Sequence, residues 1–253
     1  MNITTSQKIL LPILSLSVAF CMLAFQHIEN SSQPIHFSPQ ENPVVIELFT
    51  SQSCYTCNNA DAVASAIKDY ENVIVLSYHV DYWNSLGWKD TFSDSRHTDY
   101  QRKYENKLHQ PSFTPQMIVN GTTEFDGTNI RMLNNSLKEI STTEQLANPK
   151  ASRKGRTIEM SYDLKNNQDF TNAYALLLMD SFEMDINKSP NTNMTLVNPN
   201  VVLKKVPLKI NVEKGAQTFE LPSIVDENNK FKVALLLQDE NMTVVAASIA
   251  TVQ

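Results

Sequence analysis

The stretch that decides the fold is Val44-Val45-Ile46-Glu47-Leu48-Phe49-Thr50-Ser51-Gln52-Ser53-Cys54-Tyr55-Thr56-Cys57. Its apolar first half predicts a buried strand over residues 44–49, and a short polar turn then leads into a Cys-x-x-Cys pair. Cys54 and Cys57 are the only cysteines outside the N-terminal apolar segment. Thiol or disulfide chemistry in the rest of the chain therefore involves this pair.

The residues that follow the cysteines predict a strand–helix–strand unit. Apolar residues recur with helical spacing over 58–70, and residues 73–78 form a second apolar run. Such a unit joins two parallel strands. A charged helix from Ser93 or Ser95, strands at 116–120 and 122–125, and a helix at 130–140 complete the order β-α-β-α-β-β-α. This order predicts a thioredoxin-like topology.

The sequence changes character near residue 150. Helical periodicity stops after Asn148-Pro149, and a β-rich pattern begins. Strand-like segments follow at 158–164, 173–179, 201–212, 219–221, 231–237 and 244–249. About six strands in about 100 residues are typical of a small antiparallel sandwich. The predicted fold class is therefore α/β: a thioredoxin-like domain over 43–148, followed by a small antiparallel β-sandwich-like domain over 152–253.

The N-terminus has the pattern of a targeting segment. Lys8 precedes an apolar run over 9–25, which fits either a secretory signal peptide or an uncleaved N-terminal anchor. Residues 26–42 are polar and proline-containing, as in a tether. We therefore predict an exported protein, periplasmic or secreted, whose membrane attachment, if it has one, is through residues 9–25 only.

Composition argues against several classes of function. The chain has only 5 glycines, and neither dinucleotide-binding nor P-loop glycine patterns occur. Its formal net charge is -6 and no basic stripe is evident, so we expect no nucleic-acid partner. We predict no cofactor.

The predicted chemistry is that of a redox dithiol. A cysteine near a helix N-terminus is favoured as the thiolate by the helix dipole and by nearby backbone N–H groups. Cys54 is the predicted nucleophile. Cys57, about one turn further along, is the predicted resolving thiol that closes the disulfide and releases a partner. The predicted partners are protein thiols or disulfides.

Two further segments are expected near the dithiol. Thr114-Pro115 precedes the third strand, and in the predicted topology this proline is cis and lines the groove for a partner chain. The alternative is an ordinary trans proline that starts a strand. His79, Asp81 and Trp83 follow the second strand, at the sheet end where sites often form. They are candidates for a proton relay or a substrate-orienting group, or else for a structural loop.

Metal binding and a static disulfide are the alternatives for the cysteines. Cys54 and Cys57 with His79 and either His97 or His109 could supply four ligands. The chain has no second Cys-x-x-Cys, and the histidines lack ligand spacing, so we predict no metal site. Transient copper binding stays open. A structural disulfide across so short a loop would stabilise the fold little.

The longer motifs resemble a secreted thioredoxin-like family called domain of unknown function 1223. The similarity extends over nearly all of the chain after the N-terminal segment. It is carried by Glu47 to Cys54 with Cys57 and Ala60-Asp61, Tyr78 to Trp83, Leu86 to Asp90, Thr114 to Met117 with Gly121, Asn198, Asn200 to Val202 and Val244 to Ala247. The resemblance implies export and a dithiol at Cys54 and Cys57 beside Pro115, but no defined activity. The family often has glycine and proline where this chain has Ser53 and Asn58, so a redox potential does not carry over.

The sequence thus predicts an exported thiol–disulfide oxidoreductase-like protein that uses Cys54 and Cys57. The alternative is a non-catalytic binding module that holds a protein partner or copper on the same scaffold. A third hypothesis is a structural adaptor in which the β-rich segment acts and the disulfide is inert.

Overall fold

The computed structural model describes residues 35, 42–138, 143–186, 194–226 and 228–253. The first part of the chain contains β1 (Val44–Thr50), α2 (Cys57–Ile67), β2 (Val73–His79), the 3₁₀-helix η2 (Tyr82–Leu86), α3 (Ser95–Leu108), β3 (Gln116–Val119), β4 (Thr123–Asp126) and α4 (Ile130–Lys138). The second part contains β5 (Glu144–Gln145), β6 (Lys150–Lys154), β7 (Thr157–Asp163), β8 (Asn172–Ile186), β9 (Met194–Pro207), β10 (Lys214–Glu220), β11 (Phe231–Gln238) and β12 (Val244–Thr251). The targeting segment and nearly all of the tether lie outside the described residues, so both stay predictions. Among the described helices, none has the length and apolar character needed to cross a bilayer.

A single nine-stranded sheet runs through both parts of the chain, in the order β4-β3-β1-β2-β9-β8-β11-β12-β5. At its centre β1 and β2 are parallel, with Val44 opposite Val73 and Thr50 opposite His79. Every residue of these two strands is buried. Continuous apolar strands are what a parallel pair covered on both faces requires, which is why their sequence shows runs and no alternation.

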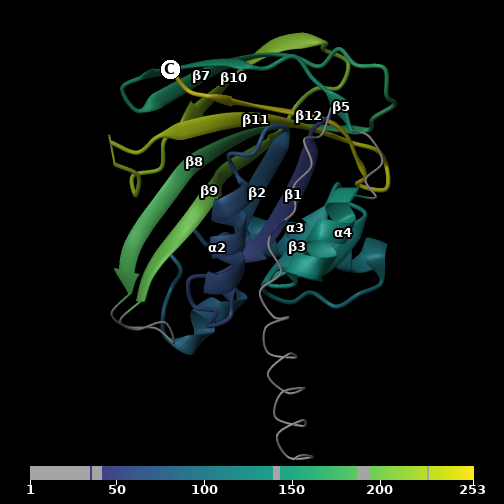
Figure 1. Ribbon diagram of the computed structural model, residues 1–253. Helices are drawn as coiled ribbons and strands as arrows, with labels where there is room; N and C mark the ends of the chain where they lie inside the picture. The colour runs from purple at the N-terminus through teal and green to yellow at the C-terminus, as the bar shows by residue number, and fades with distance from the viewer. Residues whose placement is uncertain (1–34, 36–41, 139–142, 187–193, 227) are drawn as a thin grey trace, which may run out of the picture. The chain divides into compact units, whose positions relative to one another are not determined.

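The predicted fold class is wrong. The element order expected over residues 44–138 is present, but the sheet does not end at β2, because β9 lies beside it and leads into β8, β11 and β12 (Figure 1). Four of the strands expected to form a separate sandwich, β8, β9, β11 and β12, instead extend this mixed sheet, which curls, and strands outnumber helices in the described residues. The added strands cover the β2 edge, which an isolated first half would leave exposed.

The longest strands are β8 and β9, with 15 and 14 residues. They pair antiparallel from Tyr174 opposite Pro207 to Ile186 opposite Met194. Figure 1 shows this pair curving past β2 and α2. The sequence pattern predicted strands at 173–179 and 201–212, so it missed the second half of β8 and the first half of β9, and it extended the second strand past Pro207.

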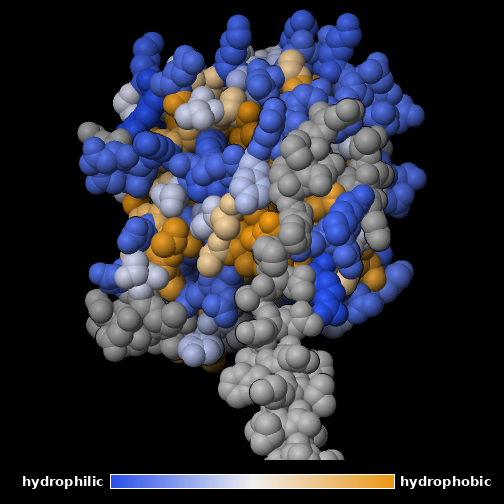
Figure 2. Space-filling model, in the orientation of Figure 1, coloured by the Kyte–Doolittle hydropathy of each residue, from blue (hydrophilic) through white to orange (hydrophobic). Residues whose placement is uncertain are grey.

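A second sheet of three strands, in the order β10-β7-β6, packs on the main sheet. Figure 1 shows β7 and β10 across β11. Ile158, Met160 and Phe219 from this sheet share an apolar cluster with Val233 and Leu235 of β11. β7 alternates between buried and exposed residues, as expected of a sheet with one covered face. Figure 2 shows hydrophilic side chains over much of the outer surface in this view.

The two parts of the chain share a hydrophobic core. One buried cluster joins Val45 and Leu76 of β1 and β2 to Leu178 of β8 and Val202 of β9. The described residues from 42 onward accordingly belong to one compact unit.

A buried polar contact also crosses this core. The Gln238 amide of β11 donates to the hydroxyl of Tyr104 on α3 over 3.0 Å, and that hydroxyl donates to the buried carboxylate of Glu47 on β1. Unfolding of either part would leave these buried groups unpaired.

The shared core predicts that a mutation in β8 destabilises the region around both tryptophans, which are Trp83 and Trp88. Leu178→Ala removes a side chain that is fully buried, and such a change typically costs about 2–5 kcal/mol. We expect denaturant unfolding followed by tryptophan fluorescence and by circular dichroism to shift together to lower denaturant. Ile210→Ala, at a half-exposed side chain, is the control. A tryptophan transition that stays in place in Leu178→Ala would contradict the shared core.

Candidate functional site

The predicted dithiol pair forms a disulfide. Cys54 and Cys57 are bonded through their sulfurs, with Cα atoms 5.4 Å apart. They lie in the turn between β1 and α2, where the Cys54 N–H donates to the Ser51 carbonyl over 3.0 Å. The structure thus confirms that Cys54 and Cys57 are placed to form a disulfide.

The helix begins at the second cysteine of the pair. Cys57 is the first residue of α2, and its N–H donates to the Cys54 carbonyl over 3.3 Å. Thr56 precedes the helix without a side-chain cap. Backbone N–H groups of a first helical turn have no intrahelical partner, and they favour a negative charge nearby. Both sulfurs therefore lie where a thiolate is stabilised.

The disulfide is buried, and the residues between its cysteines are not. Cys54 and Cys57 have 0% exposed surface, whereas Tyr55 is 68% exposed. The Thr56 hydroxyl lies 3.6 Å from the Cys54 sulfur. Tyr55 and Thr56 are therefore the exposed part of the turn that carries the disulfide.

Residues that follow η2 fix the turn before the disulfide. The Gln52 N–H donates to a carboxylate oxygen of Asp90 over 2.7 Å, and the Ser53 hydroxyl donates to the Trp88 carbonyl over 2.9 Å. The Gln52 side-chain oxygen accepts from the Thr91 N–H over 3.0 Å. The Trp88–Thr91 segment therefore holds the turn that presents Cys54.

His79 is paired with Asp90 and not with Asp81. The His79 Nδ1 lies 2.8 Å from an Asp90 carboxylate oxygen, and both side chains are fully buried. Burial lowers the pKa of His79, but the charge and hydrogen bond of Asp90 outweigh it, so the His79 pKa is raised. Burial raises the pKa of Asp90. The charge and hydrogen bond of His79, together with two backbone N–H groups, lower this pKa by more than burial raises it, so the net shift is downward. The two opposite pKa shifts favour a histidine cation paired with an aspartate anion in the core.

The other predicted residues lie in two separate contacts. Asp81 accepts a hydrogen bond from Thr98 of α3, away from His79. Trp83 donates its indole N–H to the Thr114 hydroxyl over 2.8 Å. The Thr114–Pro115 bond is cis, as predicted. Pro115 directly precedes β3, whose Gln116 is opposite Phe49 of β1. Pro115 is thus at the end of the sheet from which the disulfide turn leaves.

Asp61 is a buried acid that sequence reasoning did not select. It lies four residues after Cys57 on the buried face of α2, and its side chain is only 3% exposed. Burial raises the pKa of Asp61 to about 7, although the charge of His79 and hydrogen bonds from Thr50 and Asn198 lower it. The available signal was the i, i+4 spacing from Cys57, which places both side chains on one helix face.

Asn198 brings the second part of the chain into this site. Its side-chain oxygen accepts from the Gln52 amide over 2.9 Å, and its NH₂ group lies 3.4 Å from an Asp61 carboxylate oxygen. The bond from Gln52 defines which end of the Asn198 amide faces Asp61. A residue of β9 therefore contacts both the turn before the disulfide and the acid beneath it.

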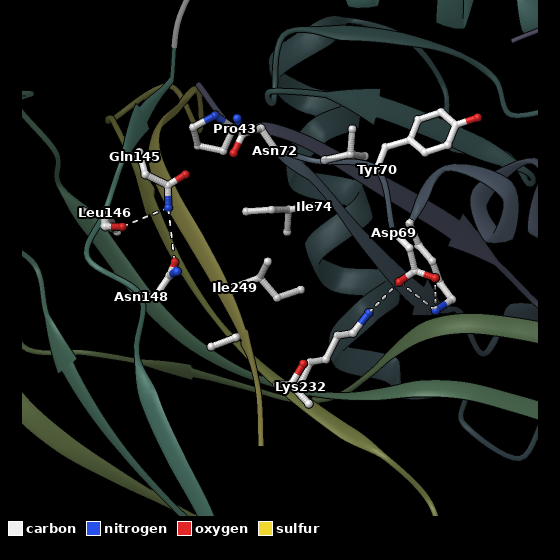
Figure 3. Close-up of a pocket in the computed structure, with 14 residues that line it drawn as sticks. Pro43, Asp69, Tyr70, Asn72, Ile74, Gln145, Leu146, Asn148, Lys232 and Ile249 are labelled. Carbon is white, nitrogen blue, oxygen red and sulfur yellow. Dashed lines mark hydrogen bonds and ion pairs between the residues drawn. The ribbon is translucent and has the colours of Figure 1, made fainter. Parts of the chain in front are cut away.

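One pocket lies at the other end of the sheet. It has a volume of about 450 Å³ and is lined by Pro43 and Asn72, which precede β1 and β2. Figure 3 shows the side chain of Lys232 of β11 reaching Asp69 along one side of this pocket, at a distance of 3.2 Å. Lys232 also pairs with Asp180. These opposite charges are paired with one another and connect the segment after α2 to β8 and β11.

Metal ligands are not assembled in the described part of the chain. No three His, Cys, Asp or Glu side chains there are close enough to hold an ion. The ring of His97 lies against the His79 carbonyl, with its Nδ1 3.0 Å away. Burial lowers the pKa of His97 to about 4. His109 ends α3 in a left-handed conformation.

The His79–Asp90 pair predicts a pH-dependent cost for Asp90→Asn. A histidine with a raised pKa stabilises the fold below its unfolded pKa, and that stability is lost as the pH rises through its folded pKa. An aspartate with a lowered pKa contributes above its unfolded pKa and loses this as the pH falls. We therefore expect Asp90→Asn to cost about 3–5 kcal/mol near pH 5, and less at about pH 9, in denaturant unfolding. An equal cost at both values would contradict a charged pair.

Comparison with known proteins identifies the family. The sequence pattern of the family "Protein of unknown function (DUF1223)" matches residues 45–238. The X-ray crystal structure of a protein from Agrobacterium tumefaciens is similar, with a TM-score of 0.59 and 26% identity, over 83% of this chain and 95% of that one. No curated protein matches at a significant level. The match confirms the resemblance predicted from the motifs, without its thioredoxin-like fold: the chain belongs to the DUF1223 family.

Proposed function

We propose that the protein exchanges its Cys54–Cys57 disulfide with the thiols and disulfides of other proteins. The observation that carries this is the position of the bridge at the first turn of α2, where a buried acid, Asp61, follows Cys57 by four residues on the buried helix face. A bridge that only stabilises the fold gains little from a loop of this size. A redox pair, in contrast, benefits from the helix N-terminus, which lowers the pKa of a nearby thiol.

Cys54 is the attacking thiol in this proposal. It precedes the helix, and the exposed Tyr55-Thr56 pair follows it, whereas Cys57 is inside the helix above Asp61. A displacement of Tyr55 opens Cys54 before it opens Cys57. The Thr56 hydroxyl near the Cys54 sulfur can donate to its thiolate.

The exchange runs in two balanced steps. The Cys54 thiolate attacks one sulfur of a partner disulfide, forming a mixed disulfide and releasing the other partner sulfur as a thiolate. Cys57 then attacks the Cys54 sulfur, which closes the internal disulfide and frees the second partner thiol. Two electrons pass from the dithiol to the partner disulfide. The reverse sequence oxidises a partner dithiol.

The surface for a partner chain lies beside the disulfide in this proposal. Trp83 and Thr114 are joined by a hydrogen bond next to Pro115. Tyr55 and Leu86 are large apolar side chains with 68% and 60% exposed surface. They suit an unfolded or extended polypeptide, whose cysteines are accessible. Export through residues 1–25 would place the dithiol in a compartment where disulfides persist.

A static role for the disulfide is the competing function. The observation that favours it is the complete burial of both sulfurs. In that case the chain is a binding module whose disulfide only shapes the turn. The two functions differ in whether a mixed disulfide with an external thiol ever forms.

Trapping of that mixed disulfide tests the proposal. In a Cys21→Ser background, Cys57→Ala leaves Cys54 without its resolving partner, so glutathione disulfide should leave one stable glutathione adduct, seen by intact mass. The reduced protein with both cysteines should instead return to its internal disulfide without an adduct. Cys54→Ala is the matched control and should form adduct at least about 10-fold more slowly, because Cys57 lies within α2 whereas Cys54 precedes the helix. Equal adduct formation on both variants would contradict Cys54 as the nucleophile.

A further inference from the structure

We propose that Asp61 takes the proton from Cys57 when this thiol attacks the mixed disulfide, and that Asn198 of β9 positions Asp61 for that step. The inference rests on the proposed function and adds to it a catalytic acid–base group. It also gives the β-rich part of the chain a role at the dithiol.

The helix geometry brings Asp61 to Cys57. Residues four apart on a helix have Cβ atoms about 5–6 Å apart. Helical side chains lean towards the N-terminus, so Asp61 covers the turn that contains Cys57. Both side chains are on the buried face of α2, with exposed fractions of 3% and 0%. Water is therefore a poor proton acceptor for Cys57, and Asp61 is the buried acid on the same helix face, one turn further along.

The surroundings of Asp61 suit a group that gains and loses a proton near neutral pH. The Thr50 hydroxyl of β1 donates to one carboxylate oxygen over 3.0 Å, and the Asn198 NH₂ group faces the other. Both contacts favour the ionised acid, and burial opposes it. From β2, the charge of His79 also favours the ionised form, whereas that of Asp90 disfavours it. The balance leaves the Asp61 pKa at about 7, where a general base is most effective.

The proton and the electrons balance in this step. The ionised Asp61 accepts the proton of the Cys57 thiol, and the Cys57 sulfur attacks the Cys54 sulfur of the mixed disulfide. The Cys54–Cys57 bond forms as the bond from Cys54 to the partner sulfur breaks. The partner leaves as a thiolate, and Asp61 then releases its proton to it or to solvent. The oxidant is the partner disulfide.

Asn198 acts through Asp61, so it is a positioning residue. Gln52 donates to the Asn198 oxygen over 2.9 Å, and this contact orients the amide so that its NH₂ group faces Asp61. Gln52 belongs to the turn that carries Cys54. Loss of the Asn198 donor removes a contact that favours the ionised acid. The pH at which Asp61 titrates must then rise.

The resolving step can be measured separately from the first attack. Reduced full-length protein in a Cys21→Ser background is mixed with dithiobis-nitrobenzoate, and released thionitrobenzoate is followed by absorbance. Attack by Cys54 releases the first equivalent, and attack by Cys57 on that adduct releases the second. We expect Asp61→Asn to slow the second release about 100-fold near neutral pH, with the first release unchanged. Asp99→Asn, at an exposed acid on α3, is the matched control.

Asn198→Ala is a second variant, and its result does not depend on whether Asp61→Asn folds. We expect the pH midpoint of the second release to move upward by about one unit, and Asn59→Ala, at an exposed position on α2, to leave it in place. A second release that is unchanged in Asp61→Asn, or a midpoint that stays in place in Asn198→Ala, would overturn the role of Asp61. Cys57→Ala should give no second release, because it lacks the resolving thiol. If the parent protein also gives no second release, the proposed function itself fails.

Discussion

The junction between β2 and β9 is the contact on which the rest of the structure depends. Only Ser77 and Val201 pair as neighbours in the ladder between these strands, so side chains supply much of the connection. The Asn200 amide donates to the Val75 carbonyl over 3.1 Å, from a residue whose own backbone is left-handed. Asparagine tolerates that conformation better than most residues and brings its own donor. An amide side chain here takes the place of a regular strand hydrogen bond.

That junction also explains why the dithiol cannot be understood from the first part of the chain alone. β9 lies against β2 and beside α2, and Asn198 thereby enters the buried space under the disulfide. Each buried polar group there needs a partner, since an unpaired one costs about 1–3 kcal/mol. Gln52, Asn198 and Asp61 satisfy one another across three elements. The contacts that join β9 to the first part of the chain therefore also define the surroundings of Cys57.

The sequence predicted what depends on local pattern. The strands at 44–49 and 73–78 were located to within a residue, because buried parallel strands are continuous apolar runs. The predicted fold class was wrong because pairing at the β2 edge joins residues more than 100 positions apart. The periodicity of apolar residues indicates single strands and helices, but it does not indicate which distant strands pair. The same limit applied to the site. The disulfide could be predicted because Cys54 and Cys57 are only three positions apart in the sequence. The partner of His79 is Asp90, and the alternation of side chains along one strand could not indicate this.

The reduction potential of the Cys54–Cys57 pair tests the central claim most directly. The full-length protein with Cys21→Ser would be equilibrated in glutathione buffers of known potential, and its thiol state read by alkylation and gel shift. A redox-active pair predicts a midpoint between about -120 and -270 mV, the range of working oxidoreductases. A pair that stays oxidised below about -300 mV would contradict the account, because such a disulfide is structural.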